Sequence, residues 1–567
     1  MREGDEARTG VKQPSPGSKL PARLLAVGIG AGFLLHLREW SFVCDDAFIS
    51  FRYARNLGQH GALVYNLAPF ERVEGYTNLL WVLMLGLGDA LGVRAETLAP
   101  VLTAVASLAG LLLVALISAQ LRRRFGPARR GAQLGPSSDT DELEYADLLA
   151  PALLATLPEF VVWGSSGLET SVALSLGLAA IWLWLGGRIE LAAVAACLAG
   201  LTRLDALVWI AAFGLGWLSV VGLERGPRQI PWRRVLIGSA LFVVPLVIQL
   251  IARKSYYGEW LPNTWAVKHH GAGLREFYGV GYLKFWADRV DLVWLIPAAL
   301  LLRPRHLPLV LPIAVQLGWA WSIGGDFMAY GRFLLPATTL TLLLLGLVLG
   351  EARDQLRLRG WLSLVWAELV WAGVALALMV GYARQIPARI QEDREHAFLH
   401  IDYEDPKQTP GFEGVDAMHR FAAVRYAAGL AFRASVPADT RITVGAAGAL
   451  PYASELPAFD SYGLVDPGVV AVAEPKTKGA RPGHQLQAPL DYMLRAHQPD
   501  LLCHIGYAGT RPPSRAAARR LRGVRGWTGW ACVETGAIPD PRAEAGELPS
   551  HHYCCARPRG RFEELDE

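Results

Sequence analysis

Two adjacent carboxylates, Asp45 and Asp46, directly follow the first long apolar run of the chain, residues 24–43. A carboxylate near hydrocarbon costs several kcal/mol unless it is paired or hydrated, so this pair indicates a polar site at a membrane boundary. Neighbouring like charges raise at least one of the two pKa values, which suits a proton acceptor near neutral pH. The sequence does not distinguish which of the two is the catalytic base. The structural alternative is that Asp45 or Asp46 only caps or orients a helix beside the membrane.

Arginines recur near the same boundary and could hold a phosphate, because a guanidinium donates paired hydrogen bonds to phosphate oxygens. Arg203 stands two residues before Asp205, and these side chains could instead neutralise one another. For each arginine alone, the alternative is a snorkelling or ion-paired side chain. The predicted donor- or phosphate-binding residues are Arg52, Tyr53, Arg203, Lys268 and Arg332.

Further polar residues interrupt the apolar runs and are predicted to bind substrate. They are Glu71, Glu74, Tyr76, Asn78, Glu169, Asp205, Asn263 and Asp326. The turn 164–167 either offers free amides to a sugar or is a simple tight turn. The histidine pairs at 269–270 and 551–552 match no standard zinc spacing, so no metal ligands are predicted. A divalent cation that helps to hold a phosphate is left open as a cofactor.

The composition places these residues in a membrane protein. Of 567 residues, 52% are hydrophobic and only 19% are charged, which is typical of a polytopic α-helical membrane protein. The net charge of +4 is small and the basic residues are scattered, so no nucleic acid partner is expected. The run 24–43 follows basic residues and has no small-residue cleavage site, which predicts an uncleaved signal anchor.

Apolar runs recur until about residue 382, which divides the chain into a predicted cytoplasmic tail (1–23), a transmembrane domain (24–382) and a soluble domain (383–567). Arginine-rich loops set the orientation and give about eleven transmembrane helices, within a range of nine to thirteen. In this topology the loop 44–97, and with it every unusual polar cluster, lies on the extracytoplasmic side of the cell membrane. The apolar run 77–91 stays on that side.

The soluble domain is predicted to be a mixed α/β cap, also extracytoplasmic. Residues 441–445 and 500–505 have the pattern of short buried strands, and residues 418–434 that of an amphipathic helix. Cys503, Cys532, Cys554 and Cys555 are either free thiols or, in an oxidising compartment, paired.

This setting indicates a class of chemistry. No nucleotide-activated substrate is available outside the membrane, so a group-transfer enzyme there must take its donor from the lipid phase, for example as a polyprenyl-phosphate sugar. The reaction needs a carboxylate to accept the proton of an acceptor hydroxyl and cations to hold the departing phosphate. A single displacement inverts the sugar carbon.

Several motifs, taken in their order along the chain, resemble those of a known family. The family is the bacterial terminal arabinofuranosyltransferases of mycobacterial type and their relatives, which belong to the GT-C class. The motifs are Asp45–Tyr53, Glu71–Asn78, Ser166–Thr170, Leu261–Thr264, Gly324–Phe327 with Arg332-Phe333, and in the cap Val444–Tyr452 and Gly463–Asp466. One departure is Leu204, where relatives have proline.

The resemblance implies an enzyme that moves arabinofuranose from a polyprenyl-phosphate donor to a glycan or glycoprotein acceptor of the cell envelope, with a first-loop aspartate as base. That role falls on Asp45 or Asp46. One alternative is the same machinery with mannose or another sugar. Alternatives from other classes are a transporter or flippase for lipid-linked glycans and a non-catalytic scaffold.

Overall fold

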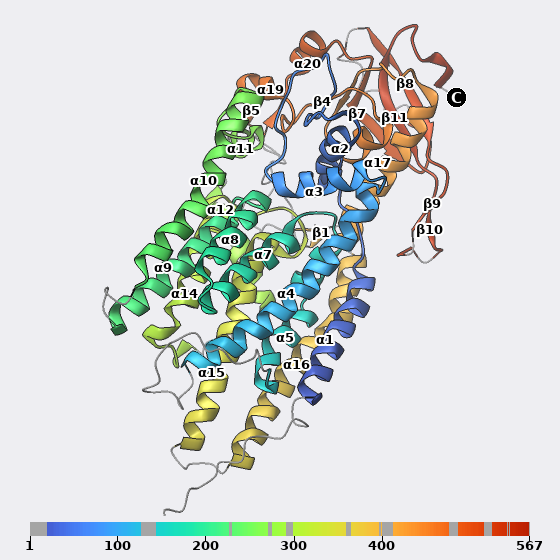
Figure 1. Ribbon diagram of the computed structural model, residues 1–567. Coiled ribbons are helices and arrows are strands. Elements are labelled where there is room, and N and C mark those ends of the chain that lie inside the picture. Colours follow the sequence, from blue (N-terminus) through green and yellow to red (C-terminus); the bar gives the residue numbers. More distant parts are fainter. Residues whose placement is uncertain are drawn as a thin grey trace, which may run out of the picture.

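A sheet-containing cap lies at one end of a long body of helices (Figure 1). The computed structural model describes residues 20–565 except 126–142, 226–229, 270–274, 291–298, 359–363, 396–397, 400–411, 476–485, 515–523, 525, 541 and 544. Most of the predicted cytoplasmic tail, residues 1–19, lies outside the described residues.

The body consists of helices, most of them apolar, because a helix satisfies its own backbone hydrogen bonds in lipid. In chain order they are α1 (Leu20–Glu39), α2 (Asp45–His60), α3 (Leu79–Ala90), α4 (Ala95–Phe125), η3 (Tyr145–Leu148), α5 (Leu149–Thr156), α6 (Pro158–Val161), η4 (Val162–Gly164), α7 (Thr170–Leu185), α8 (Ile189–Thr202), α9 (Ala206–Arg225), α10 (Trp232–Tyr257), α11 (Asn263–His269), α12 (Arg275–Arg289), η8 (Pro304–His306), α14 (Leu307–Ser322), η9 (Ala329–Leu334), α15 (Leu335–Leu358) and α16 (Leu364–Glu395).

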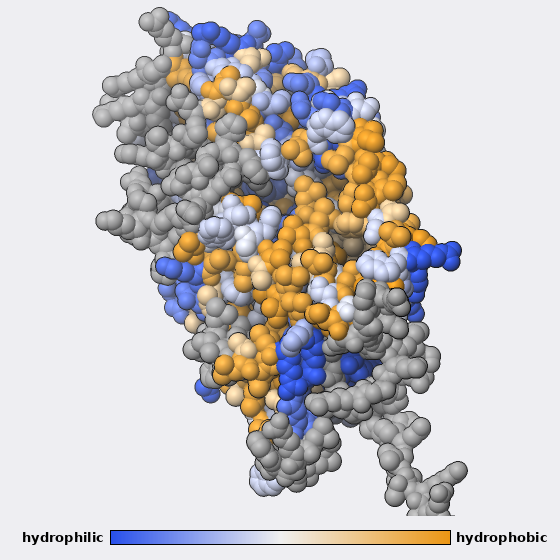
Figure 2. Space-filling model, turned by 90° about the vertical axis from the view of Figure 1, so that its left-hand side faces the viewer, coloured by the Kyte–Doolittle hydropathy of each residue, from blue (hydrophilic) through white to orange (hydrophobic). Residues whose placement is uncertain are grey.

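Within the described residues, five helices are long and apolar enough to cross a membrane, and a sixth span results if the pair Tyr145–Thr156 and Pro158–Gly164, bent by 77°, is one crossing. Hydrophobic side chains gather over the middle of the face in Figure 2, with hydrophilic ones above them. The chain is therefore a multi-pass membrane protein. The count of about eleven remains a prediction, because α3, α7 and α8 are apolar but shorter and most of the predicted span at 292–302 lies outside the described residues.

The cap is built on a five-stranded sheet of order β4-β3-β7-β11-β8. Strand β3 pairs in parallel with β4 and β7, and β11 pairs antiparallel with β7 and β8. The two predicted strands and the predicted helix are confirmed as β3, β7 and α17. The cap elements are β1 (Phe398–Leu399), β2 (Phe412–Glu413), α17 (Val415–Ser435), β3 (Ile442–Val444), α18 (Ala449–Ser454), β4 (Ala458–Asp460), α19 (Pro467–Val472), β5 (Glu474–Pro475), β6 (Leu486–Gln487), α20 (Leu490–His497), β7 (Leu501–Gly509), β8 (Trp527–Glu534), β9 (Ile538–Pro539), β10 (Glu547–Leu548), β11 (His552–Pro558) and η11 (Glu563–Leu565).

Two disulfides cross-link this sheet. Cys503–Cys555 joins β7 to β11, and Cys532–Cys554 joins β8 to β11. All four cysteines of the cap are therefore paired, which is one of the two alternatives that the sequence left open.

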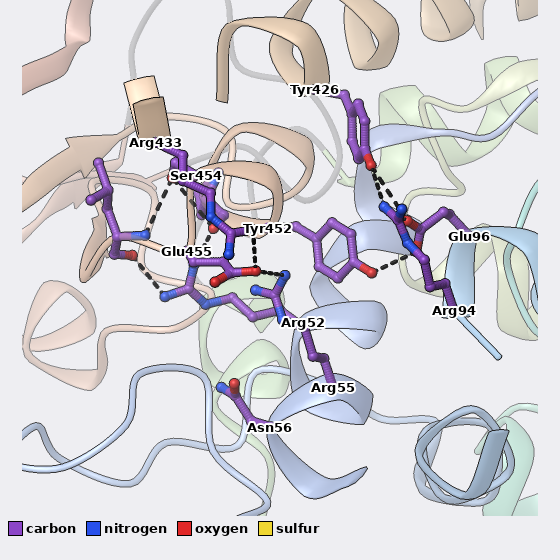
Figure 3. Close-up of polar contacts among 12 residues, drawn as sticks. Arg52, Arg55, Asn56, Arg94, Glu96, Tyr426, Arg433, Tyr452, Ser454 and Glu455 are labelled. Atoms are coloured by element: carbon purple, nitrogen blue, oxygen red, sulfur yellow. Dashed lines mark hydrogen bonds and ion pairs between the residues drawn. The ribbon is translucent and has the colours of Figure 1, made fainter. Parts of the chain in front are cut away.

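Polar contacts fix the cap on α2 and on the start of α4 (Figure 3). The Glu455 carboxylate lies 3.0 Å from Arg55 of α2 and 2.7 Å from Arg433 of α17. The Tyr452 hydroxyl donates to Glu96 of α4 at 2.6 Å. The contacts of Glu455 with Arg55 and of Tyr452 with Glu96 join segments more than 350 residues apart in sequence, so they help to hold the cap against the helices.

Candidate active site

The turn before α7 holds the start of α2, which carries the aspartate pair. The N–H of Cys44 donates to the Ser166 carbonyl at 3.1 Å. Gly167 has a φ of 81°, and a Cβ there would lie only 3.0 Å from Ala47 and from Phe51. Only glycine combines this left-handed conformation with such close packing. The turn 164–167 therefore supports α2, which favours the simple-turn alternative over direct sugar binding.

Asp45 is bound to the cap. Its carboxylate accepts a hydrogen bond from the Ala449 N–H at 2.9 Å, and the Gly448 backbone is so near that a Cβ there would lie 2.4 Å from the carboxylate. Burial raises the pKa of Asp45 to about 6, although Arg425 opposes that shift. The side chain is only 9% exposed. These contacts give Asp45 the structural role of joining α2 to the cap.

Asp46, in contrast, is half-buried and lines two cavities. One, the helix-side cavity, has a volume of about 440 Å³. The other, the cap-side cavity, has a volume of about 260 Å³ and lies between α2 and the cap. The residues common to both linings are Asp46, Ile49, Phe327 and Leu464. A ligand in either cavity can therefore reach the Asp46 carboxylate.

The helix-side cavity collects side chains from widely separated motifs. Its polar lining contains most of the predicted site residues, namely Asp46, Tyr76, Asn78, Glu169, Arg203, Asp205, Asp326 and Arg332. The same lining contains apolar rings, including Trp265, Trp319 and Phe333. A charged region bordered by apolar rings suits a ligand with an ionic head and a hydrocarbon chain.

Arg203 is fully engaged by carboxylates in this cavity. Its Nη1 donates to Glu169 at 3.0 Å, and its Nε and Nη2 donate to Asp205 at 2.9 and 3.1 Å. Asn78 holds the other oxygen of Glu169 at 2.7 Å. The mutual neutralisation of Arg203 and Asp205 that the sequence offered as an alternative is therefore present.

Arg332, unlike Arg203, has guanidinium nitrogens left to bind a ligand. Its Nε donates to Asp326, whereas its two terminal nitrogens have no hydrogen-bond partner among the described residues. Left-handed conformations at Tyr330 and Gly331 (φ 53° and 60°) turn the chain immediately before it. The Phe333 ring lies 5.1 Å from the Arg332 guanidinium and 5.2 Å from that of Arg203. This ring thus contacts both cations, and of the two it is Arg332 that has nitrogens left to bind an anion.

Arg52 lies in the junction between α2 and the cap, outside both cavities. Its Nε donates to the Tyr65 carbonyl at 2.7 Å, and its Nη2 donates to Leu456 at 2.8 Å and to Asn66 at 2.9 Å. Its Nη1 donates to the Pro451 carbonyl. The predicted phosphate-binding role does not fit this placement, since a buried guanidinium bonded to backbone carbonyls has no free side for a phosphate.

Two other predicted site residues, Tyr53 and Glu74, also have structural contacts. The Tyr53 hydroxyl donates to the Val73 carbonyl at 2.6 Å and lines neither cavity. Glu74 forms a buried ion pair with Arg253 of α10 at 2.5 Å. Both contacts fix the loop between α2 and α3, and neither places its residue beside Asp46.

Two further predicted residues, Asn263 and Glu71, do not line either cavity. Asn263 donates to the carbonyls of Gly463 at 2.5 Å and Leu464 at 3.2 Å, which ties α11 to the cap. Glu71 is exposed. The side chain of Lys268 lies outside the described residues.

Sequence reasoning missed the polar residues that the cap brings to the cap-side cavity. These are Arg425, Tyr462, His504 and Tyr507. The available signal was weak, because His504 merely interrupts a predicted strand. In the described part of the chain, no group of three or more His, Cys, Asp or Glu residues is arranged to hold a metal ion.

A multi-pass helical body under an α/β cap is the class of fold that this chain adopts, and a solved structure shares it. ArnT from Cupriavidus metallidurans in the apo state aligns over 95% of this chain and 98% of its own, at 14% identity and a TM-score of 0.52. ArnT from the same organism bound to undecaprenyl phosphate aligns over 78% of this chain and 86% of its own, with a TM-score of 0.45 and 14% identity.

In sequence, the chain is similar to the terminal β-(1→2)-arabinofuranosyltransferase of Mycobacterium tuberculosis, with 29% identity over 400 residues. That alignment covers 62% of this chain and 59% of the relative, so it spans about three fifths of the relative's length. Residues 416–545 of the cap match a family described as a domain of unknown function (DUF8728).

Proposed function

We propose that this chain is a membrane glycosyltransferase that moves a sugar from a polyprenyl-phosphate donor to a hydroxyl of an envelope glycan or glycoprotein. One observation carries the proposal: the Asp46 carboxylate lines both a cavity with two arginines and apolar rings and a second, polar cavity. A single base would thus stand between two substrate-sized spaces. The similarity to an arabinofuranosyltransferase supports arabinofuranose as the sugar.

In the proposed reaction, the oxygen of an acceptor hydroxyl forms a bond to the anomeric carbon of the donor sugar. The bond between that carbon and the phosphate oxygen breaks, and the hydroxyl proton passes to Asp46. Polyprenyl phosphate leaves as an anion, which the terminal nitrogens of Arg332 would hold. The displacement occurs from the face opposite the leaving group, so the sugar carbon is inverted. Trp265 and Trp319 supply apolar surface for the prenyl chain.

The disulfides of the cap support an extracytoplasmic position for the cap and both cavities. Disulfides form and persist in oxidising compartments and are rare in the cytosol. With the cap outside, the donor would be reached from the lipid phase and the acceptor from the cell envelope.

The test uses the full chain purified into lipid nanodiscs, with polyprenyl-phosphate arabinofuranose as donor and a synthetic arabinan oligosaccharide as acceptor. We expect transfer by the wild-type protein and a loss of at least about a hundredfold for Asp46→Asn, the range of general-base catalysis. Glu71→Gln, in an exposed acid of the same loop, is the matched control and should retain full activity. Full activity of folded Asp46→Asn protein, or no transfer by the wild type, would contradict the proposal. Transfer of mannose but not of arabinofuranose would overturn only the assignment of the transferred sugar.

A further inference from the structure

The cap-side cavity contains polar residues that the proposed reaction leaves unused. We propose that this cavity binds the terminal sugar of the acceptor glycan, with His504 as a residue that hydrogen-bonds and positions it. This inference rests on the proposed function and adds to it the location and the recognition of the acceptor.

The shape of the cavity favours one sugar over a protein surface. Its volume of about 260 Å³ is near the lower limit for sites that bind small molecules. One wall is built from small residues that follow β3, and α2 with Asp46 forms another. Small side chains leave the backbone accessible, which gives hydroxyl groups both donors and acceptors. The small wall residues are Gly445, Ala446 and Ala447.

His504 is held by a single contact. On β7, its Nδ1 lies 2.6 Å from the hydroxyl of Thr443 on β3, and Thr443 is fully buried. Among the described residues, its Nε2 has no hydrogen-bond partner. Burial lowers the pKa of His504 to about 4, so the ring is neutral at pH 7. A neutral imidazole with one nitrogen fixed offers the other nitrogen to a hydroxyl group.

An aromatic ring beside the same cavity suits the apolar face of a sugar. Phe421 of α17 is 38% exposed, and the Arg425 guanidinium lies 3.2 Å from its ring centroid. Both residues line the cavity. A ring that is covered on one side by a cation and remains partly exposed is a platform on which the C–H groups of a sugar can pack.

The charge of the cavity favours an uncharged polyol over a phosphate. Its lining contains the carboxylates of Asp45, Asp46 and Glu413, against the one guanidinium of Arg425 among the described residues. Acids in excess repel a phosphate group but accept hydrogen bonds from hydroxyls. Acids are also in excess in the described lining of the helix-side cavity, four against two arginines, but there the terminal nitrogens of Arg332 remain for a phosphate. In the cap-side cavity, the guanidinium of Arg425 lies against the Phe421 ring instead.

The inference is tested with His504→Phe in the nanodisc assay with the same donor and acceptor. Loss of one hydrogen bond at a buried site should raise the KM for the arabinan acceptor by about five- to tenfold. The KM for the donor, and the slow hydrolysis of donor by water when acceptor is absent, should stay within twofold of wild type. His552→Phe, on the neighbouring strand and outside the cavity, is the matched control and should change none of these values.

A second variant, Ala446→Leu, reduces the space in the cavity from another wall residue and leaves His504 unchanged in the sequence. It should also raise the KM for the acceptor while donor hydrolysis persists. If the wild type transfers sugar and neither variant changes the KM for the acceptor, the acceptor inference is wrong and the proposed function stands. A parallel loss of donor hydrolysis in both variants would also overturn it, because the effect would then be structural. A wild type that neither transfers nor hydrolyses the donor rejects the proposed function itself.

Discussion

The Asp45 carboxylate accepts a hydrogen bond from the backbone N–H of Ala449 at 2.9 Å, across 404 residues of sequence. Successive residues on a helix point about 100° apart, so Asp46, the next residue of α2, lines both cavities, while Asp45 lies against the cap and lines only the cap-side cavity. The two acids that look equivalent in the sequence therefore have different surroundings. One holds the cap on α2, and the other is the candidate base.

Replacement of Gly448 should loosen this junction. A Cβ at residue 448 would lie 2.0 Å from the Asp45 carbonyl oxygen, so Gly448→Ala must push the backbones apart. We expect a loss of roughly 1–3 kcal/mol in the free energy of unfolding, as for overpacked sites, measured by thermal unfolding of the purified protein. At Gly445, the nearest atoms to an added Cβ are 3.5 Å away. Gly445→Ala is thus the control, and an equal effect of both variants would contradict the prediction.

The pH dependence of stability should contain a contribution from Asp45. Burial raises its pKa from 3.8 to about 6 in the folded protein, so the folded state binds the proton more tightly than the unfolded state. This stabilisation is fully present below pH 4 and is lost as the pH rises through about 6, by up to about 3 kcal/mol.

The measurement compares unfolding midpoints of the wild type and Asp45→Asn between pH 4 and pH 7. The wild-type midpoint should fall relative to that of the variant over this range, because asparagine does not titrate. Two parallel curves would show that Asp45 has an ordinary pKa.

Replacement of Arg52 should lower the stability of the protein and leave donor binding unchanged. Lysine cannot reach the four acceptors of the Arg52 guanidinium, so Arg52→Lys leaves buried carbonyls unpaired. We expect a loss of about 3 kcal/mol in the free energy of unfolding with the KM for the donor unchanged. Arg55→Lys, whose partner Glu455 has a 39% exposed side chain, is the control on the same helix and should cost less than about 1 kcal/mol. A raised KM for the donor in folded Arg52→Lys protein would restore the phosphate-binding role.

Arg332 should bind the donor phosphate. Removal of its terminal nitrogens in Arg332→Gln eliminates up to two charge-assisted hydrogen bonds, each worth about 1.5–3 kcal/mol. The KM for the donor should therefore rise by at least about tenfold, in steady-state assays with acceptor held at saturation. Arg234→Gln, at a partly exposed ion pair with Glu190, should leave it unchanged. An unchanged value in Arg332→Gln would remove Arg332 from the phosphate site.

The cysteines of the cap can report its side of the membrane. In intact cells, a membrane-impermeant maleimide should label the cap only after treatment with a membrane-impermeant phosphine, which reduces Cys503–Cys555 and Cys532–Cys554. A variant with serine at these four positions is the control for labelling elsewhere. Labelling that requires permeabilised cells would place the cap, and the proposed active site with it, in the cytoplasm.

The sequence alone determined the class of architecture and many residues of the candidate site. Apolar runs and β-strand patterns are local features of the sequence, and their periodicity indicates the elements of the fold. A charge between apolar segments is energetically costly, which marks it as a candidate site residue. This reasoning found Asn78, Glu169, Arg203, Asp205 and Arg332, which the structure brings to one cavity with Asp46.

Only the tertiary structure decided how the individual residues divide their roles. The separation of Asp45 from Asp46 depends on the direction of each side chain on α2 and on a cap more than 400 residues away. Arg52 has the same local pattern as a phosphate-binding arginine, but backbone carbonyls of the cap surround it. His504 has no motif at all, because its position beside the cavity results from the pairing of β3 with β7. Contacts between distant segments leave no periodicity in the sequence, so they can be read only from the folded chain.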